Sequence, residues 1–168
     1  MSSAPVAAPR AGVPQLLIAG IGEMVISKNP KVTLVAYGLG SCVGLSAWDP
    51  STSVGGLAHF MLPVGPPGGP PVKFIEGGLQ AFIQGFAQHG GRPGNAQFKG
   101  VGGAAMLSIL SGGQEIGRRN AEAIAAGLAA LGLRLHARDL GGTAGRTVQL
   151  EVATGRLLVK SMSTVTFL

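Results

Sequence analysis

Charged residues are scarce in this chain, and so are aromatic residues, cysteine and long apolar runs. Only 12% of the 168 residues are charged and 5% are aromatic, whereas 46% are hydrophobic, and the chain has 29 glycines and 11 prolines. The apolar content suffices for a core, and the length fits one domain. Frequent glycine and proline predict many tight turns, which suit a compact strand-rich fold better than a helical bundle.

Several of these scarcities exclude a class of protein. The single cysteine, Cys42, excludes an internal disulfide, and no Cys/His cluster has the spacing of a zinc site. No stretch reaches the roughly 18 apolar residues of a membrane-spanning helix. The first 15 residues lack the apolar segment of a signal peptide. We therefore expect a cytoplasmic protein that is not embedded in a membrane and holds no metal.

The formal net charge of +6 raises the question of nucleic-acid binding. The basic residues are spread along the chain, and their only adjacent pair is Arg118-Arg119. No basic run alternates with aromatic residues, so we expect no nucleic-acid partner. A mildly positive surface instead favours approach to an acidic protein partner. We expect a monomer.

Periodicity and turn residues predict the order of the elements. Residues 1–15 are expected to be a disordered tail, and residues 16–168 a single domain. Alternating or continuous apolar runs predict strands, and apolar residues at helical spacing predict two helices. The strands are expected at 23–27, 32–37, 43–48, 55–61, 97–107, 133–139, 147–152 and 157–160, and the helices at 72–89 and 114–131. This order predicts an α/β or α+β fold, a strand-rich sheet with two main helices packed on it.

A few further polar positions allow a structural or a functional interpretation. Gly90-Gly91 should end the first helix, with His89 as a helix-terminus histidine, and His136 should be structural. Arg118 and Arg119 are expected to face solvent. The GGTAGR segment, residues 141–146, could form an anion-binding nest, but a turn between strands is the simpler interpretation.

Cys42 and His59 are the candidate catalytic residues. Cys42 follows the glycines of GLGSC at the junction of two apolar runs, and His59 lies near the end of the next predicted strand. Two antiparallel strands joined by the intervening turn can bring a thiol and an imidazole side by side. Such a pair is the minimum for an activated cysteine nucleophile. A lone cysteine is, however, more commonly an inert part of the core.

The sequence motifs of these segments resemble those of the CheD family, the chemoreceptor glutamine deamidases. GLGSCVGLSAWDP and GGLAHFMLP are followed, in the family's order, by GVGGAAML, IGRRN and RDLGGTAGRTVQL. The resemblance implies a three-layer α/β sandwich in which Cys42 is the nucleophile and His59 is its base. Backbone N–H groups around Gly40 and Ser41 are the natural donors to the oxygen that becomes negative during attack.

The resemblance further implies the reaction and the partners. The reaction is deamidation of glutamines on the cytoplasmic helices of methyl-accepting chemotaxis receptors, through a thioester and with no cofactor. A CheC-type phosphatase is a further partner of some members. The chain departs from the family at Ala36, where a threonine that orients the histidine usually stands, and Thr33 should face the other side of the strand. A non-catalytic or weakly catalytic adaptor is therefore the alternative, and a cysteine protease is a more distant one.

Overall fold

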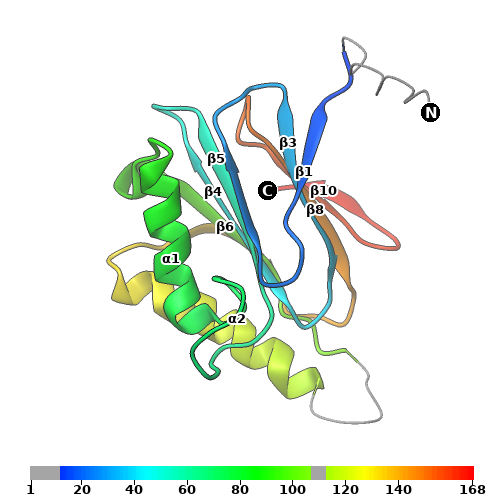
Figure 1. Cartoon of the computed structure of the whole chain (residues 1–168). Coiled ribbons are helices and arrows are strands. Elements are labelled where there is room, and N and C mark those ends of the chain that lie inside the picture. Colours follow the sequence, from blue (N-terminus) through cyan, green and yellow to red (C-terminus); the bar gives the residue numbers. More distant parts are fainter. Residues whose placement is uncertain (1–11, 107–112) are drawn as a thin grey trace, which may run out of the picture.

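The computed structural model describes residues 12–106 and 113–168, and its regular structure is mixed α/β (Figure 1). The strands are β1 (Gln15–Ile18), β2 (Met24–Ser27), β3 (Val32–Leu39), β4 (Val43–Asp49), β5 (Val54–Phe60), β6 (Gln97–Gly102), β7 (Leu135–Leu140), β8 (Arg146–Glu151), β9 (Leu157–Lys160) and β10 (Val165–Phe167). The helices are α1 (Ile75–Gln88) and α2 (Gly113–Ala130), with a short 3-10 turn, η1 (Pro93–Asn95). Within these ranges no helix is both long and apolar enough to cross a membrane.

The strands divide between two five-stranded sheets. The first sheet has the order β1-β3-β8-β9-β10, and the second has the order β2-β5-β4-β6-β7. The pairs β1–β3 and β6–β7 are parallel, and the other neighbours are antiparallel. The candidate catalytic pair belongs to the second sheet, where β4 lies between β5 and β6.

Each face of the second sheet contributes to a different apolar cluster. Because side chains alternate along a strand, Ala58 of β5 packs with residues of α1 and α2, whereas Leu57 packs with residues of the first sheet. Figure 1 shows both helices on the side of the second sheet that faces away from the first. We call the cluster that contains Leu57 the inter-sheet core. Its buried members are Ala19, Val32, Leu34, Ala36, Leu39, Leu57, Val101, Val148, Leu150, Val152, Leu157 and Val159.

Most predicted elements are confirmed. The mixed α/β class and both helices are found, and β2 to β5, β8 and β9 lie where the pattern predicts them. The strand predicted for 97–107 ends at Gly102 as β6, since Gly102 and Gly103 both have positive φ (113° and 63°). Of the predicted tail, residues 1–11 lie outside the described residues, and Gln15 begins β1.

The division into two sheets was not predicted, and neither were strands β1 and β10. Both unpredicted strands lie at the edges of the first sheet and are only four and three residues long. Such short segments carry too few residues for a readable alternation. The layered sandwich that the family resemblance implies stays a prediction in its details.

Predictions about individual polar and glycine residues are also confirmed. Gly90 has a φ of 95° at the end of α1, and the N–H of Gly91 donates to the carbonyl of Phe86 at 3.0 Å. His89 contacts the carbonyl of Gly85 through Nδ1 at 2.8 Å, within the last turn of α1. His136 accepts a hydrogen bond from the N–H of Phe98 at 3.2 Å, so it ties β7 to β6.

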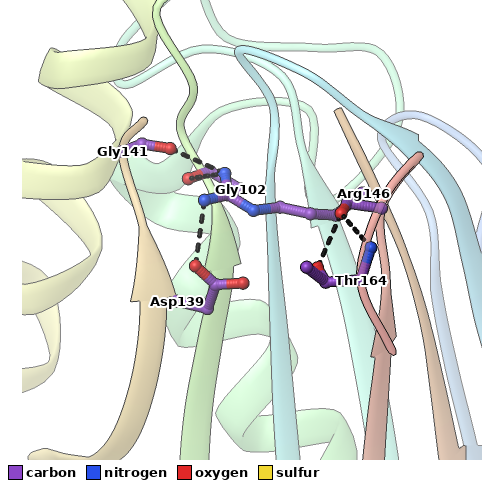
Figure 2. Close-up of polar contacts among 6 residues, drawn as sticks. Gly102, Asp139, Gly141, Arg146 and Thr164 are labelled. Carbon is purple, nitrogen blue, oxygen red and sulfur yellow. Dashed lines mark hydrogen bonds and ion pairs between the residues drawn. The ribbon is translucent and has the colours of Figure 1, made fainter. Parts of the chain in front are cut away.

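The predicted turn at 141–146 carries the chain from the second sheet to the first, and Arg146 holds it in place. The Arg146 guanidinium donates to the carbonyl of Gly141 at 2.7 Å and pairs with Asp139 at 2.9 Å (Figure 2). It also reaches the carbonyl of Gly102 at 3.4 Å. Because Arg146 is 9% exposed, these contacts fix the end of β6, which lies next to Cys42.

Close packing of α1 on β5 predicts the effect of enlarging Gly56. A Cβ at this position would lie 3.0 Å from Cε2 of Phe82 and 3.3 Å from Cδ2 of Phe86. We expect Gly56→Ala to lower the free energy of unfolding by about 1–3 kcal/mol through overpacking. The melting temperature should fall by about 2–4 °C for each kcal/mol. Gly94→Ala is the control, because a Cβ there meets no atom within 4 Å. Equal melting temperatures of the two variants would contradict the tight packing.

Candidate functional site

Strands β4 and β5 place Cys42 and His59 on one face of the second sheet. Their antiparallel register pairs Gly44 with His59 and Val43 with Phe60. Cys42 precedes β4 by one residue and shares a face with Gly44, because side chains alternate along a strand. The thiol and the imidazole are therefore diagonal cross-strand neighbours, a relation in which the backbones are about 7–8 Å apart. The structure thus brings together the two residues that the sequence proposes as a pair.

The shared face is the one that meets the first sheet. His59 is 2% exposed, and it lies on the same face of β5 as Leu57, which belongs to the inter-sheet core. Cys42 is a free cysteine of intermediate exposure that packs against the same core. The site therefore lies at an end of the inter-sheet core where the imidazole is covered and the thiol remains partly accessible.

One nitrogen of the His59 ring has a hydrogen-bond partner among the described residues, and the other does not. Its Nδ1 lies 3.2 Å from the carbonyl oxygen of Ala19. A carbonyl oxygen can only accept a hydrogen bond, so Nδ1 carries the hydrogen and the neutral ring keeps Nε2 as an acceptor. Nε2 is buried and has no hydrogen-bond partner among the described residues. This tautomer is the one that a general base needs.

The segment before β2 fixes the backbone of His59 as well as its ring. The His59 N–H donates to the carbonyl of Glu23 at 3.0 Å, and the His59 carbonyl accepts from the N–H of Gly22 at 2.8 Å. Ala19 is itself anchored, because its N–H donates to the carbonyl of Val35 on β3 at 2.8 Å. The first sheet therefore supports the histidine through Ala19.

Burial favours the uncharged forms of both groups. It raises the pKa of the Cys42 thiol above the ordinary value, against a smaller opposing effect of the residue's own backbone N–H. Burial also lowers the pKa of His59, and this lowering is only partly offset by the Ala19 carbonyl and the charge of Glu23. Burial therefore favours a neutral thiol and a neutral imidazole over a preformed ion pair.

The backbone around Cys42 is tied down on one side. The Cys42 carbonyl accepts from the N–H of Gly103 at 2.8 Å, and the Gly40 carbonyl accepts from the N–H of Ala104 at 2.9 Å. The Gly40 N–H, a predicted oxyanion donor, donates to the carbonyl of Gly38 at 2.9 Å. Among the described residues, the N–H groups of Ser41 and Cys42 donate to no oxygen. These two N–H groups are the ones free to bind a developing negative charge.

Ala36 and Thr33 lie on opposite faces of β3, as the alternation of side chains along a strand predicts. It is fully buried in the inter-sheet core and pairs with Val148 of β8, on the side of β3 that faces the second sheet. His59 projects into the same core. Thr33, at odd spacing from Ala36, faces the other side of β3 and does not replace the missing hydroxyl.

Asn120 is a polar contact of the site to which the sequence analysis assigned no role. It is fully buried on α2, and its Nδ2 donates to the carbonyls of Ser41 at 2.8 Å and Met61 at 2.9 Å. A signal was present in the sequence, because Asn120 occurs at four-residue spacing within the apolar stripe of this helix, between Ile116 and Ile124. A polar residue in such a stripe needs a buried partner.

Two partly exposed methionines lie close to Cys42 in the chain or in space. Met61 follows β5 and is 37% exposed, and Met106 is 38% exposed. The sulfur of Met106 would lie 3.3 Å from a Cβ added to Gly40, so it covers the glycine two residues before Cys42. As for metals, residues 12–106 and 113–168 contain no group of three or more His, Cys, Asp or Glu side chains that could hold an ion.

Comparison with known proteins gives a consistent result. The model of the CheD family, described as CheD chemotactic sensory transduction, matches residues 61–161. A probable chemoreceptor glutamine deamidase CheD of Symbiobacterium thermophilum is 40% identical over 149 residues, which cover 85% of this chain and 90% of that protein. The chemoreceptor glutamine deamidase CheD of Thermotoga maritima is 38% identical over 146 residues, covering 86% and 91%.

The similarity extends to an archaeal protein. A probable chemoreceptor glutamine deamidase CheD of Haloarcula marismortui is 37% identical over 158 residues, covering 93% of this chain and 91% of that protein. Identity at this level over most of both chains is enough to assign the family. The chain therefore belongs to the CheD family.

Proposed function

We propose that this chain is a protein-glutamine deamidase, which converts glutamine side chains of methyl-accepting chemotaxis receptors to glutamate. The observation that carries the proposal is the open Nε2 of His59 on the same sheet face as Cys42. The named activity of the relatives, chemoreceptor glutamine deamidation, supplies the substrate class.

In the proposed reaction, Cys42 is the nucleophile and His59 the base. Nε2 of His59 takes the thiol proton as the sulfur attacks the carboxamide carbon of the glutamine. The amide oxygen becomes negative and is bound by backbone N–H groups beside Cys42. His59 then gives its proton to the departing nitrogen, and ammonia leaves. Water hydrolyses the remaining thioester to a carboxylate and restores the thiol.

The neutral resting pair fits a site that is activated by its substrate. A neutral imidazole can accept the thiol proton, whereas the imidazole of a preformed ion pair already carries that proton. Met61 and Met106 are 37% and 38% exposed, and such adaptable apolar side chains suit the apolar face of a receptor helix.

An adaptor with little catalysis is the second candidate. It is favoured by Ala36, which removes the family's orienting hydroxyl, and by the raised pKa of the Cys42 thiol. Such a protein would bind receptors, or a CheC-type phosphatase, through the same surface. In either role we propose that the chain acts as a monomer. It acts in the cytoplasm, where the receptor helices are found.

Removing the nucleophile tests the deamidase directly. We expect Cys42→Ala to abolish deamidation of a receptor cytoplasmic fragment, because the thioester cannot form. The measurement is the mass gain of about one dalton per glutamine, read by mass spectrometry. His59→Ala should lose most of the rate as well, whereas His89→Ala is the control, since the His89 ring bonds to the Gly85 carbonyl of its own helix. A wild-type protein that binds the fragment and leaves its mass unchanged would favour the adaptor.

The pH dependence of Cys42 alkylation tests the charge state of the pair. Because burial raises the pKa of the thiol, the thiolate fraction at pH 7 should be smaller than that of an exposed cysteine. We therefore expect iodoacetamide to react with Cys42 more slowly than with glutathione at pH 7, and the rate to climb through the alkaline range. A fast rate that stays level from pH 6 to pH 8 would instead show a preformed thiolate–imidazolium pair.

Restoring the threonine at position 36 tests how the imidazole is held. Ala19 already occupies Nδ1 at 3.2 Å, so an added hydroxyl has little to supply. We expect Ala36→Thr to change the single-turnover rate by less than about threefold, well below the tenfold that a full hydrogen bond of about 1.4 kcal/mol would give.

The matched control is Thr33→Ala, which changes the same strand on its other face. The melting temperature of Ala36→Thr must be read beside its rate, because Ala36 is fully buried and a larger side chain can overpack the core. A gain of tenfold or more in a stable Ala36→Thr protein would show that the native imidazole is poorly held.

A further inference from the structure

Asn120 joins two carbonyl groups at the ends of the strands that carry Cys42 and His59. One belongs to Ser41, directly before Cys42, and the other to Met61, two residues after His59. Beyond Val43 and Phe60 the paired segment of β4 and β5 ends. Where β4 and β5 separate, the side-chain amide of Asn120 therefore replaces the hydrogen bonds of the β-ladder.

The approach of α2 to this point depends on small residues. A Cβ on Gly117 would overlap the carbonyl oxygen of Ala104, and a Cβ on Gly103 would lie 2.8 Å from the carbonyl oxygen of Gly117. Asn120 lies one turn further along the same helix. Glycine at both positions lets α2 come close enough for the Asn120 amide to reach the loop of Cys42.

The hydrogen bond to Ser41 fixes the orientation of the next peptide group. The described residues contain no cis peptide bond. In a planar trans peptide, the C=O of Ser41 and the N–H of Cys42 point in opposite directions. Because the Ser41 carbonyl points at the buried Asn120 amide, the Cys42 N–H points away from α2. That N–H donates to no oxygen of the described residues.

We propose that Asn120 is a positioning residue that aims the Cys42 N–H at the oxygen of the tetrahedral intermediate. The inference rests on the proposed function, for which it supplies the origin of the oxyanion donor. Asn120 does not touch the substrate and acts through the Ser41–Cys42 peptide group. Its second bond, to Met61, keeps this peptide in register with the end of β5, which carries His59.

Two reagents separate this role from a general structural one, and neither requires a receptor. p-Nitrophenyl acetate acylates a thiol through a tetrahedral oxyanion: a C–S bond forms, the ester C–O bond breaks, and p-nitrophenol takes up the thiol proton. Iodoacetamide alkylates the same thiol by direct displacement of iodide, with no oxyanion. The ratio of the two rates at Cys42 therefore reports on the oxyanion donor, whether or not the protein deamidates receptors.

The experiment compares wild type, Asn120→Ala and Asn120→Asp. A buried aspartic acid keeps the shape of asparagine but offers at most one hydrogen, so it is the second variant if the alanine protein does not fold. Removing an oxyanion donor outright costs about 100- to 1,000-fold. For a donor that is present but misaimed, we expect acylation to fall by about tenfold or more while alkylation stays within about threefold.

Ile124→Ala is the matched control, because Ile124 is also fully buried on α2 but belongs to the core on the helix side. It should lower the melting temperature at least as much as the Asn120 variants and leave the ratio of the two rates unchanged. The proposal is overturned if acylation by the Asn120 variants is unchanged, if acylation and alkylation fall together, or if Ile124→Ala shifts the ratio equally. A wild type that fails to deamidate receptors but shows the expected ratios would overturn the proposed function alone.

Discussion

The antiparallel register of β4 and β5 is the constraint on which the site depends. It pairs Gly44 with His59, so the imidazole and the Cys42 thiol share the face of the second sheet that meets the first. A slip of one residue would turn His59 toward the helices, because successive side chains of a strand point to opposite faces. Strands β5 and β6 each pair with β4 along almost its whole length, so both fix its register.

Burial gives the site its chemical character. The inter-sheet core covers His59 and half-covers Cys42, and this burial raises the pKa of the thiol and lowers the pKa of the imidazole, which favours their neutral forms. A buried polar ring would be unfavourable without a partner. The Ala19 carbonyl provides that partner at Nδ1, and by doing so it leaves Nε2 as the acceptor. One backbone contact thus satisfies Nδ1 and selects the tautomer in which the unpartnered Nε2 can take a proton.

The support of the site comes from both of its sides. Ala19, anchored on β3 of the first sheet, holds the histidine from one side. Asn120 of α2 holds the backbone before Cys42 and after His59 from the other. Arg146 fixes the end of β6 and the turn at Gly141, next to the segment that binds the Cys42 carbonyl (Figure 2). These contacts are the reason for expecting only a small effect of threonine at position 36.

Most secondary-structure elements and the candidate pair could be predicted from local patterns in the chain. Alternation and helical spacing located most strands and both helices, because these periodicities are local properties of the chain. They also placed Ala36 and Thr33 on opposite faces of β3. The motif around Cys42 and His59 predicted them as the candidate nucleophile and base, and their strands could be predicted to be adjacent because a short turn joins them.

The surroundings of that pair could not be predicted, because they depend on long-range contacts. The division into two sheets, the carbonyl of Ala19 at the imidazole and the amide of Asn120 at Ser41 all join segments that are far apart in sequence. Every residue has a backbone carbonyl whatever its side chain, so no sequence motif could predict the contact of Ala19 with His59. The charge state of Cys42 and His59 was also beyond the sequence, since it follows from how deeply the two sheets bury them.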